Sequence, residues 1–207
     1  MSTLDQLFKA QSRELQSRLE ELSAPNQPMT DYKLQLRHKW SKLQSPPRAQ
    51  GSKLKAWKQR RGYDLEKLIL ALCALEHLQP EAPLRPKGEQ VDGMFMLDGR
   101  AFLLEAKWQE EKKSSASEVF AFQGKLRGKL AGTLGVFVSM GGFSPDAVNA
   151  VAWGKEINVL FFDKGDIELA LAPNHHLAEI TRIKLRRAAQ RGEIYYSYKT
   201  HLDLMTA

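Results

Sequence analysis

The sequence predicts an α/β fold, in which a mixed β-sheet core flanked by helices follows a basic, α-helical N-terminal extension. Apolar residues recur at helical spacing in several segments, and short apolar runs of strand length alternate with them after residue 90. Basic residues gather in the N-terminal part. We therefore expect an extension at residues 1–61, a core at 62–173, and a C-terminal basic helix and tail at 174–207.

Composition favours a folded, water-soluble chain. The 207 residues are 43% hydrophobic and 27% charged, enough for one medium domain with an appendage. No apolar run approaches the roughly 18 residues that span a bilayer. The N-terminus lacks the apolar centre and cleavage site of a signal peptide. A single cysteine, Cys73, excludes an internal disulfide. We expect a cytoplasmic protein.

The net charge of +7 is unevenly distributed. Residues 1–61 carry 13 Lys and Arg against 5 Asp and Glu, whereas the remaining residues carry 18 against 19. Residues 32–61 contain ten basic residues and no acidic one, with Tyr32, Trp40 and Trp57 among them. Such a segment suits a polyanion, because contacts to phosphates release condensed counterions. A solvated basic linker remains the alternative.

Two helices are expected in the extension. Leucines and a phenylalanine form one apolar stripe over residues 1–22, which "SAPNQP" ends. A basic helix is expected at about residues 31–43. The prolines and glycine of "QSPPRAQGS" predict a loop after it.

The core begins with a helix and a hairpin. "YDLEKLILALCALEHL" places Leu65, Leu68, Ile69, Leu72 and Leu75 on one helical face. "VDGMFML" and "AFLLEAKW" are short apolar runs joined at Asp98-Gly99, which predicts a tight turn between antiparallel strands.

Helices and strands then alternate. "SASEVFAFQGKLRGKL" predicts a helix, and "LGVFVSM" and "INVLFF" predict buried strands. Between these strands, Ser144 can cap a helix that has Pro145 in its first turn. "GDIELAL" is either a short helix or a strand, and the tyrosine-rich tail after a basic helix is a possible strand.

Three ionisable residues in the hairpin indicate chemistry. Side chains alternate along a strand, so Glu105 and Lys107 share a face, and Asp92 on the preceding strand falls near Glu105 across the hairpin. Converging carboxylates form a hard-oxygen site suited to Mg²⁺. A lysine beside them can orient water and stabilise charge on a phosphate, which suits phosphodiester hydrolysis.

Asp92 and the "EAK" of Glu105–Lys107 resemble the motif of the PD-(D/E)xK nucleases, and the chain is most similar to the Mrr-type restriction endonucleases. The resemblance spans roughly residues 62–171, and Val91 stands where the motif has proline. It implies a restriction-endonuclease-like core, Mg²⁺ as cofactor with Mn²⁺ as its substitute, and supporting roles for Glu66 and Gln123. The alternative without a catalytic role is that Glu66 is an acid in the first turn of a helix and that Gln123 is a solvated helix residue.

The resulting hypothesis is a Mg²⁺-dependent DNA endonuclease, acting in defence against phage or plasmid DNA, as a homodimer or a subunit of a defence complex. The expected metal ligands are Asp92, Glu105 and Glu66, with Lys107 and Gln123 as further catalytic residues. The expected nucleic-acid contacts are Lys33, Arg37, Lys39, Lys42, Lys53, Lys55, Lys58, Arg60 and Arg61. A non-catalytic nucleic-acid-binding subunit with a nuclease-like fold, and a nuclease for RNA or branched DNA, remain alternatives.

Overall fold

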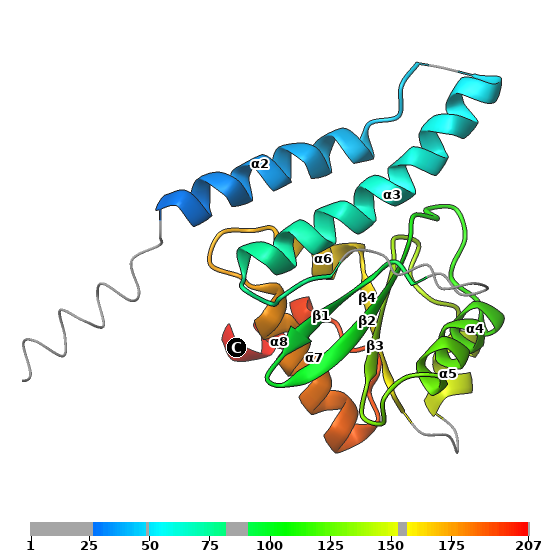
Figure 1. Cartoon of the computed structure of the whole chain (residues 1–207), viewed down its shortest axis with the longest axis vertical. Coiled ribbons are helices and arrows are strands. Elements are labelled where there is room, and N and C mark those ends of the chain that lie inside the picture. Colours follow the sequence, from blue (N-terminus) through cyan, green and yellow to red (C-terminus); the bar gives the residue numbers. More distant parts are fainter. Residues whose placement is uncertain (1–26, 49, 82–90, 153–156, 207) are drawn as a thin grey trace, which may run out of the picture.

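The computed structural model describes residues 27–48, 50–81, 91–152 and 157–206, so the helix expected at residues 1–22 lies outside the described residues. Four strands form one sheet: β1 (Gly93–Leu97), β2 (Arg100–Lys107), β3 (Leu134–Ser139) and β4 (Val159–Asp163). The helices in chain order are α2 (Gln27–Gln44), α3 (Gly51–Leu75), α4 (Ala116–Arg127), α5 (Pro145–Ala152), α6 (Lys164–Ala170), α7 (Leu177–Arg191) and α8 (Tyr198–Thr206) (Figure 1). This arrangement confirms the predicted α/β class.

The sheet is mixed, with its strands in the order β1-β2-β3-β4. β1 pairs antiparallel with β2, while β2–β3 and β3–β4 are parallel. Parallel neighbours need a crossover connection, and α4 and α5 provide the two that this sheet requires. The carboxyl ends of β2, β3 and β4 therefore lie at one edge of the sheet.

The hairpin between β1 and β2 forms at the expected turn. Asp98 and Gly99 both have positive φ, 50° and 74°, which is the conformation of a two-residue turn between antiparallel strands. The turn fixes the register, in which Phe95 is opposite Phe102 and Gly93 is opposite Leu104. Asp92, directly before Gly93, consequently reaches the level of Glu105.

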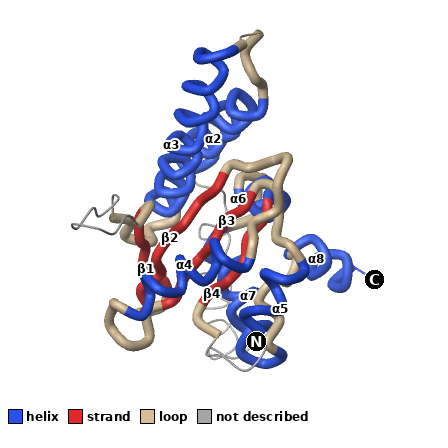
Figure 2. The backbone as a smooth tube through the Cα atoms, turned by 90° about the vertical axis from the view of Figure 1, so that its right-hand side faces the viewer, coloured by secondary structure: helices blue, strands red, loops and turns tan. Residues whose placement is uncertain are grey.

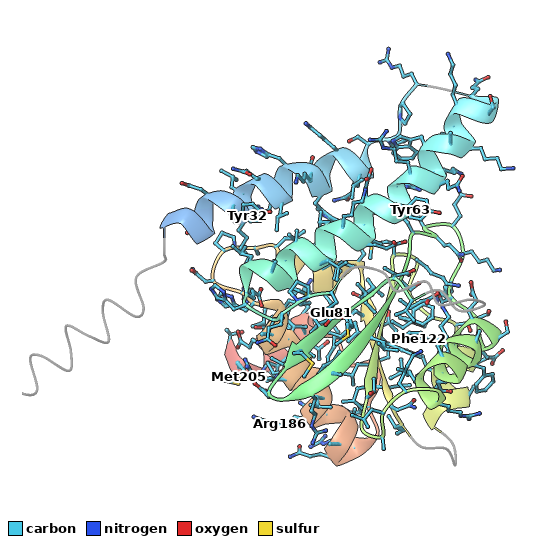
Figure 3. All side chains as sticks on the ribbon, viewed as in Figure 1. Tyr32, Tyr63, Glu81, Phe122, Arg186 and Met205 are labelled. Atoms are coloured by element: carbon cyan, nitrogen blue, oxygen red, sulfur yellow. The ribbon has the colours of Figure 1, made fainter. Side chains whose placement is uncertain are left out.

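Helices cover both faces of the sheet (Figure 2). α4 packs on β3 and against α5 on one face, and Phe122 of α4 lies between that helix and the sheet (Figure 3). α3 packs on β1 and β2, and α7 on β4, on the other face. β2 alternates accordingly, so that Phe102 and Leu104 are buried toward α3 while Glu105 and Lys107 are directed toward α4.

α2 and α3 pack side by side as a helical arm whose free end projects from the core (Figure 1). Between the two helices, the described residues 45–48 and 50 of the expected "QSPPRAQGS" loop are not helical. α3 is longer than predicted: it begins at Gly51 and runs without a break through the expected boundary at residue 61. Its C-terminal half carries the buried stripe of Leu65, Leu68 and Leu72, so one helix belongs to both the arm and the core.

The C-terminal part is helical where a strand was possible. "GDIELAL" forms α6, because Asp163 and Asp166 build a reciprocal capping box at its N-terminus. The tyrosine-rich segment contributes one backbone hydrogen bond to the sheet, from Phe161 N–H to the Ile194 carbonyl, and then enters α8.

Among the described helices, none combines the length and apolar character that a membrane span requires.

Candidate functional site

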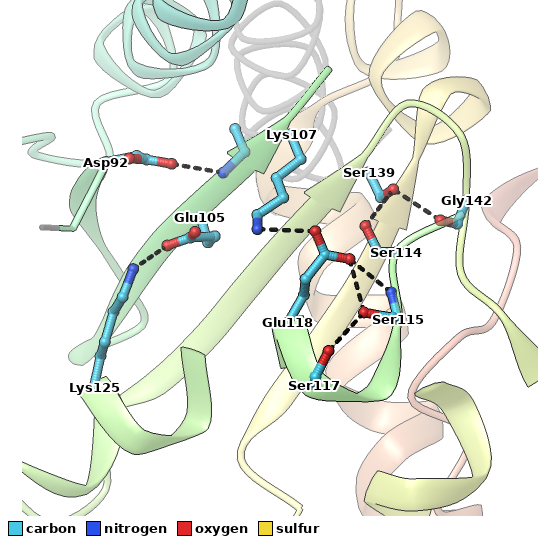
Figure 4. A network of polar contacts seen from close by, with 11 residues as sticks. Asp92, Glu105, Lys107, Ser114, Ser115, Ser117, Glu118, Lys125, Ser139 and Gly142 are labelled. Carbon is cyan, nitrogen blue, oxygen red and sulfur yellow. Dashed lines mark hydrogen bonds and ion pairs between the residues drawn. The ribbon is translucent and has the colours of Figure 1, made fainter. Parts of the chain in front are cut away.

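Asp92, Glu105 and Lys107 converge at the end of the β1–β2 hairpin, on the side covered by α4 (Figure 4). Glu105 and Lys107 share a face of β2 because they are two residues apart. Phe137 of β3 pairs with Glu105, and its ring lies 5.7 Å from the Lys107 ammonium. The Lys107 ammonium therefore sits above an aromatic ring, close to the edge where the parallel strands end.

The Asp92 carboxylate extends the hairpin ladder beyond β1. Its Oδ2 accepts a hydrogen bond of 2.9 Å from Ala106 N–H, and its own N–H donates to the Leu104 carbonyl. The residue is 7% exposed. Burial raises the pKa of Asp92 to about 6, helped by the Glu105 charge and opposed by the Ala106 hydrogen bond and by Lys125 and Lys107. Two carboxylates and two ammonium groups thus share one electrostatic environment.

Lys107 is held by the first turn of α4. Its Nζ lies 3.2 Å from Oε1 of Glu118. The other oxygen of Glu118 accepts hydrogen bonds from Ser115 N–H and Ser115 Oγ, in the capping box that starts the helix. Burial alone would raise the pKa of Glu118, but the hydrogen bonds from Ser115 and the contact with Lys107 together lower it. Glu118 is thus a fixed, charged partner for Lys107.

Glu105 is held by the last turn of α4. Nζ of Lys125 lies 2.6 Å from Oε2 of Glu105, with side-chain exposures of 23% and 13%. Charge-assisted contacts of this length are among the stronger ones in proteins. The two ends of α4 therefore contact Lys107 and Glu105 of β2.

The loop after β2 is fastened to the turn after β3. Ser114 and Ser139 are both buried: Ser114 Oγ donates to Ser139 Oγ at 2.9 Å, and Ser139 Oγ donates to the Gly142 carbonyl at 2.8 Å (Figure 4). At Gly141 a side chain would meet the Gln109 carbonyl oxygen at 2.1 Å, so only glycine allows the two loops to pass this closely. This packing fixes the start of α4 relative to Lys107.

Glu66 and Gln123 were the residues expected to support the carboxylate pair. Within the described ranges, no group of three or more His, Cys, Asp and Glu side chains is arranged to hold a metal ion, so Glu66 does not complete a three-carboxylate cluster with Asp92 and Glu105. Gln123 is buried, not solvated, and its Nε2 donates to Oδ1 of Asn158 before β4. At about 100° per residue, Gln123 lies about 140° around α4 from Glu118.

Two of the expected nucleic-acid contacts are buried. Lys33 is 7% exposed and its Nζ donates to the His175 carbonyl; burial lowers its pKa. Arg61, also 7% exposed, lies between the rings of Trp57 and Trp108, and its Nη1 is 3.2 Å from Glu110 Oε2. Neither cation is available to a phosphate in this structure. The exposed members of the set are Arg37, Lys39, Lys42, Lys53, Lys55, Lys58 and Arg60.

Trp108 joins the arm to the site. It follows Lys107 in the chain, stacks under Arg61 of α3, and contacts Trp40 of α2 at a ring-centroid distance of 5.3 Å. The two helices of the arm therefore rest on the residue next to Lys107.

Sequence reasoning missed Glu118 and Lys125 as parts of the site. They are seven residues apart, which places them on one face of a helix two turns apart. The acid and base of "EAK" thus face a base and an acid on the following helix. This complementary charge pattern could have predicted the two ion pairs from the sequence.

The family model Mrr_cat, described as a restriction endonuclease, matches residues 58–168, more than half of the chain. The comparison with curated proteins gives no significant match.

Two solved structures are similar at low sequence identity. One is a protein of unknown function, AF1548, with 11% identity and a TM-score of 0.40 over 70% of this chain and 94% of that one. The other is the MspJI restriction endonuclease in complex with a 27-mer oligonucleotide, with 19% identity and a TM-score of 0.42 over 75% of this chain and 36% of that one.

Proposed function

Because the chain belongs to the Mrr_cat restriction endonuclease family, we propose that it is a divalent-metal-dependent DNA endonuclease with its hydrolytic site at Asp92, Glu105 and Lys107. The observation that carries the proposal is the meeting of two carboxylates and a lysine at the end of the β1–β2 hairpin. Such a set of groups is suited to hydrolysis of a phosphodiester.

The donor set fits Mg²⁺ or Mn²⁺. Mg²⁺ is commonly held by one or two carboxylates, with waters and substrate phosphate completing its shell. Asp92, directly before β1, and Glu105 of β2 supply two carboxylates, and the side chains of Glu105 and Lys107 keep 13% and 26% of their surface exposed, so water and substrate can reach them. The chemistry supplied there would be neutralisation of phosphate charge. Glu66 and Gln123 are not needed for this donor set.

Lys107 is the residue that acts on the reacting groups in this proposal. Its ammonium can donate to an attacking water and to a phosphate oxygen on which negative charge develops. Glu118 limits the positions that the ammonium can take, because the capping box fixes the carboxylate. Phe137 beneath the lysine excludes water from that side and strengthens the electrostatic interactions.

DNA is proposed to lie along the arm. Lys39, Lys42 and Lys67 line a groove between α2 and α3 together with Asp64, and further exposed lysines follow the first turns of α3. Side chains project outward along both helices of the arm (Figure 3). Since Trp108 joins the arm to the strand of Lys107, a duplex held by the arm would be brought toward the site.

Incubation of the purified protein with plasmid DNA tests the function. We expect nicked and linear products in MgCl₂ or MnCl₂ and none in EDTA. Lys107→Ala should reduce cleavage by about 10²-fold, as expected for loss of a group that stabilises the transition state. Lys112→Ala, which changes an exposed lysine in the following loop, serves as the matched control. Metal-independent cutting, or equal cutting by Lys107→Ala, would overturn the proposal.

The arm gives a second prediction. Replacing Lys53, Lys55 and Lys58 together by glutamine should weaken duplex binding and reduce the slope of log K against log salt by about 2–3, because each phosphate contact contributes about 0.9. The triple variant Arg186→Gln, Arg191→Gln and Lys199→Gln removes the same charge from the exposed surface of α7 and α8 and should change the slope little. Fluorescence anisotropy at several salt concentrations measures the slope for each variant. If the two triple variants have equal slopes, the proposal that DNA binds along the arm is wrong.

A binding role without hydrolysis is the second candidate function. It is favoured by the ion pairs that Glu105 and Lys107 make with α4. Salt-sensitive DNA binding without cleavage in any divalent metal would select it. A substrate panel of duplex, single-stranded and branched DNA and RNA separates the remaining nuclease classes.

Defence against phage or plasmid DNA is our proposal for the biological role, and a homodimer or a defence complex is our proposal for the assembly. Cutting both strands of a duplex calls for two sites. Challenge of cells expressing the protein with phage or plasmid, and its mass in solution, test these proposals.

A further inference from the structure

The surface of α4 that contacts β2 carries charges complementary to those of the strand. Glu118 in the first turn contacts Lys107, and Lys125 two turns later contacts Glu105. Gly135 of β3 allows this close docking, since a side chain there would meet Phe122 at 2.6 Å and Leu126 at 2.8 Å. The helix is therefore seated by apolar packing, with one ion pair at each end of its contact with the strand.

The Lys125–Glu105 pair lies where a divalent cation would be held. The Nζ–Oε2 distance is 2.6 Å, and the ammonium also lowers the pKa of Asp92, so it acts on both carboxylates. Lys125 has a flexible stem and its ring contact to Phe122 is 6.0 Å, so its head group can move while the helix stays seated. A monovalent ammonium and a divalent cation would compete for the same oxygen.

Building on the proposed function, we infer that Lys125 is the counterion of Glu105 in the metal-free protein, which a divalent cation must displace. Displacement frees the Lys125 ammonium, which stays beside the site and can then form an ion pair with a substrate phosphate. Metal binding and phosphate binding are thereby coupled through one residue. Glu118 and Lys107 do not change partners in this step, so α4 stays in place.

Calorimetric titration of the EDTA-treated, full-length protein with MnCl₂ tests the competition. Lys125→Met keeps an apolar stem and removes the charge; it should bind Mn²⁺ at least about fivefold more tightly, because a like charge next to the cation is lost. Arg127→Met removes an exposed charge from the same turn and should stay within about twofold of wild type. Equal or weaker binding by Lys125→Met would overturn the competition. Failure of wild type, Lys125→Met and Arg127→Met alike to bind Mn²⁺ would overturn the metal site of the proposed function itself, and the competition with it.

Amine acylation followed by mass spectrometry tests the displacement on wild-type protein, independently of how any variant folds. We expect the acylation rate of Lys125 to rise at least about threefold when MnCl₂ is added, as its ion pair is lost. Exposed Lys199 should show no change. A rate at Lys125 that Mn²⁺ leaves unchanged, in protein that binds Mn²⁺ by calorimetry, would overturn the inference while leaving the proposed function intact.

Discussion

The Asp92→Asn substitution is expected to reduce the rate of DNA cleavage at least about 10³-fold. The neutral amide cannot supply the negative charge that holds and orients a divalent cation. Its oxygen can still accept the Ala106 N–H that the Asp92 carboxylate accepts at 2.9 Å. The hairpin should therefore stay intact. Initial rates of plasmid cleavage in MgCl₂ measure the loss.

Glu111→Gln is the matched control for this substitution, since it removes one carboxylate from an exposed position in the loop after β2. It should leave the cleavage rate within about twofold. If Asp92→Asn cleaves DNA at a rate close to that of Glu111→Gln, Asp92 is not part of the hydrolytic site.

The same substitution should affect stability in the opposite direction. The pKa of Asp92 rises from 3.8 to about 6 on folding, so the folded state favours the protonated carboxyl. Ionisation of Asp92 therefore destabilises metal-free wild type as pH rises from about 4 through 6, and the penalty is complete above that range. Asp92→Asn escapes it. In EDTA at about pH 8 the variant should be more stable than wild type by up to about 2–3 kcal/mol, and near pH 4 the difference should vanish.

Urea denaturation at the two pH values measures this difference. A gain in stability with a loss of activity is the expected signature of a charge kept for function. Lower stability of Asp92→Asn at both pH values would instead indicate that the carboxylate supports the fold.

The hairpin and its triad could be predicted because their signals are local. Asp98-Gly99 dictates the turn, the turn dictates the register, and the register brings Asp92 to Glu105. Alternation along β2 then places Lys107 on the same face as Glu105. None of these steps depends on how distant segments pack.

The surroundings of the triad could not be predicted in the same way. Which α4 residues meet β2 depends on the rotation of a docked helix, and several polar residues of α4 were compatible with the pattern. Gln123 illustrates this, since its position on the other flank of the buried face directs it to Asn158. Sequence spacing limits such contacts but does not select among them.

The charge count overestimated the surface available to DNA because it ignored periodicity. Lys33 shares a face of α2 with buried Leu36 and Trp40, at spacings of three and seven. Arg61 precedes Leu65 by four residues and therefore continues the buried stripe of α3. Both cations were treated as part of an exposed basic segment, although their helical positions were already visible in the sequence.

The largest effect on stability is expected at Lys184, which is fully buried in α7. Its ammonium contacts Oδ2 of Asp166 at 2.7 Å and the carbonyl oxygens of Phe161 and Tyr196 at 2.9 and 2.6 Å. These three contacts use all of its donors. Burial lowers the pKa of Lys184 and raises that of Asp166, while their mutual attraction opposes both shifts. The buried Lys184–Asp166 ion pair is therefore stable only while every hydrogen bond of the ammonium is made within the fold.

Lys184→Met should lower the free energy of unfolding by about 3–5 kcal/mol, because it leaves the Asp166 carboxylate buried without its cation. Adding Asp166→Asn should recover part of the loss, since the remaining uncompensated charge is removed. Lys199→Met, at an exposed position of α8, should change stability by less than about 0.5 kcal/mol. Urea denaturation measures all three variants, and a loss below about 1 kcal/mol for Lys184→Met would contradict this account.

The Lys184→Met substitution also separates effects on the stability of the fold from effects on the activity of the site. Lys184 binds the tyrosine-rich segment to β4, and Asp163 at the end of β4 accepts the Tyr195 hydroxyl at 3.0 Å. β3 lies between these residues and Lys107, so loosening the C-terminal segment leaves the contacts of the triad unchanged. At temperatures where Lys184→Met remains folded, cleavage per folded molecule should consequently stay within a few-fold of wild type. A collapse of activity in the folded variant would place the C-terminal helices among the elements that position the site.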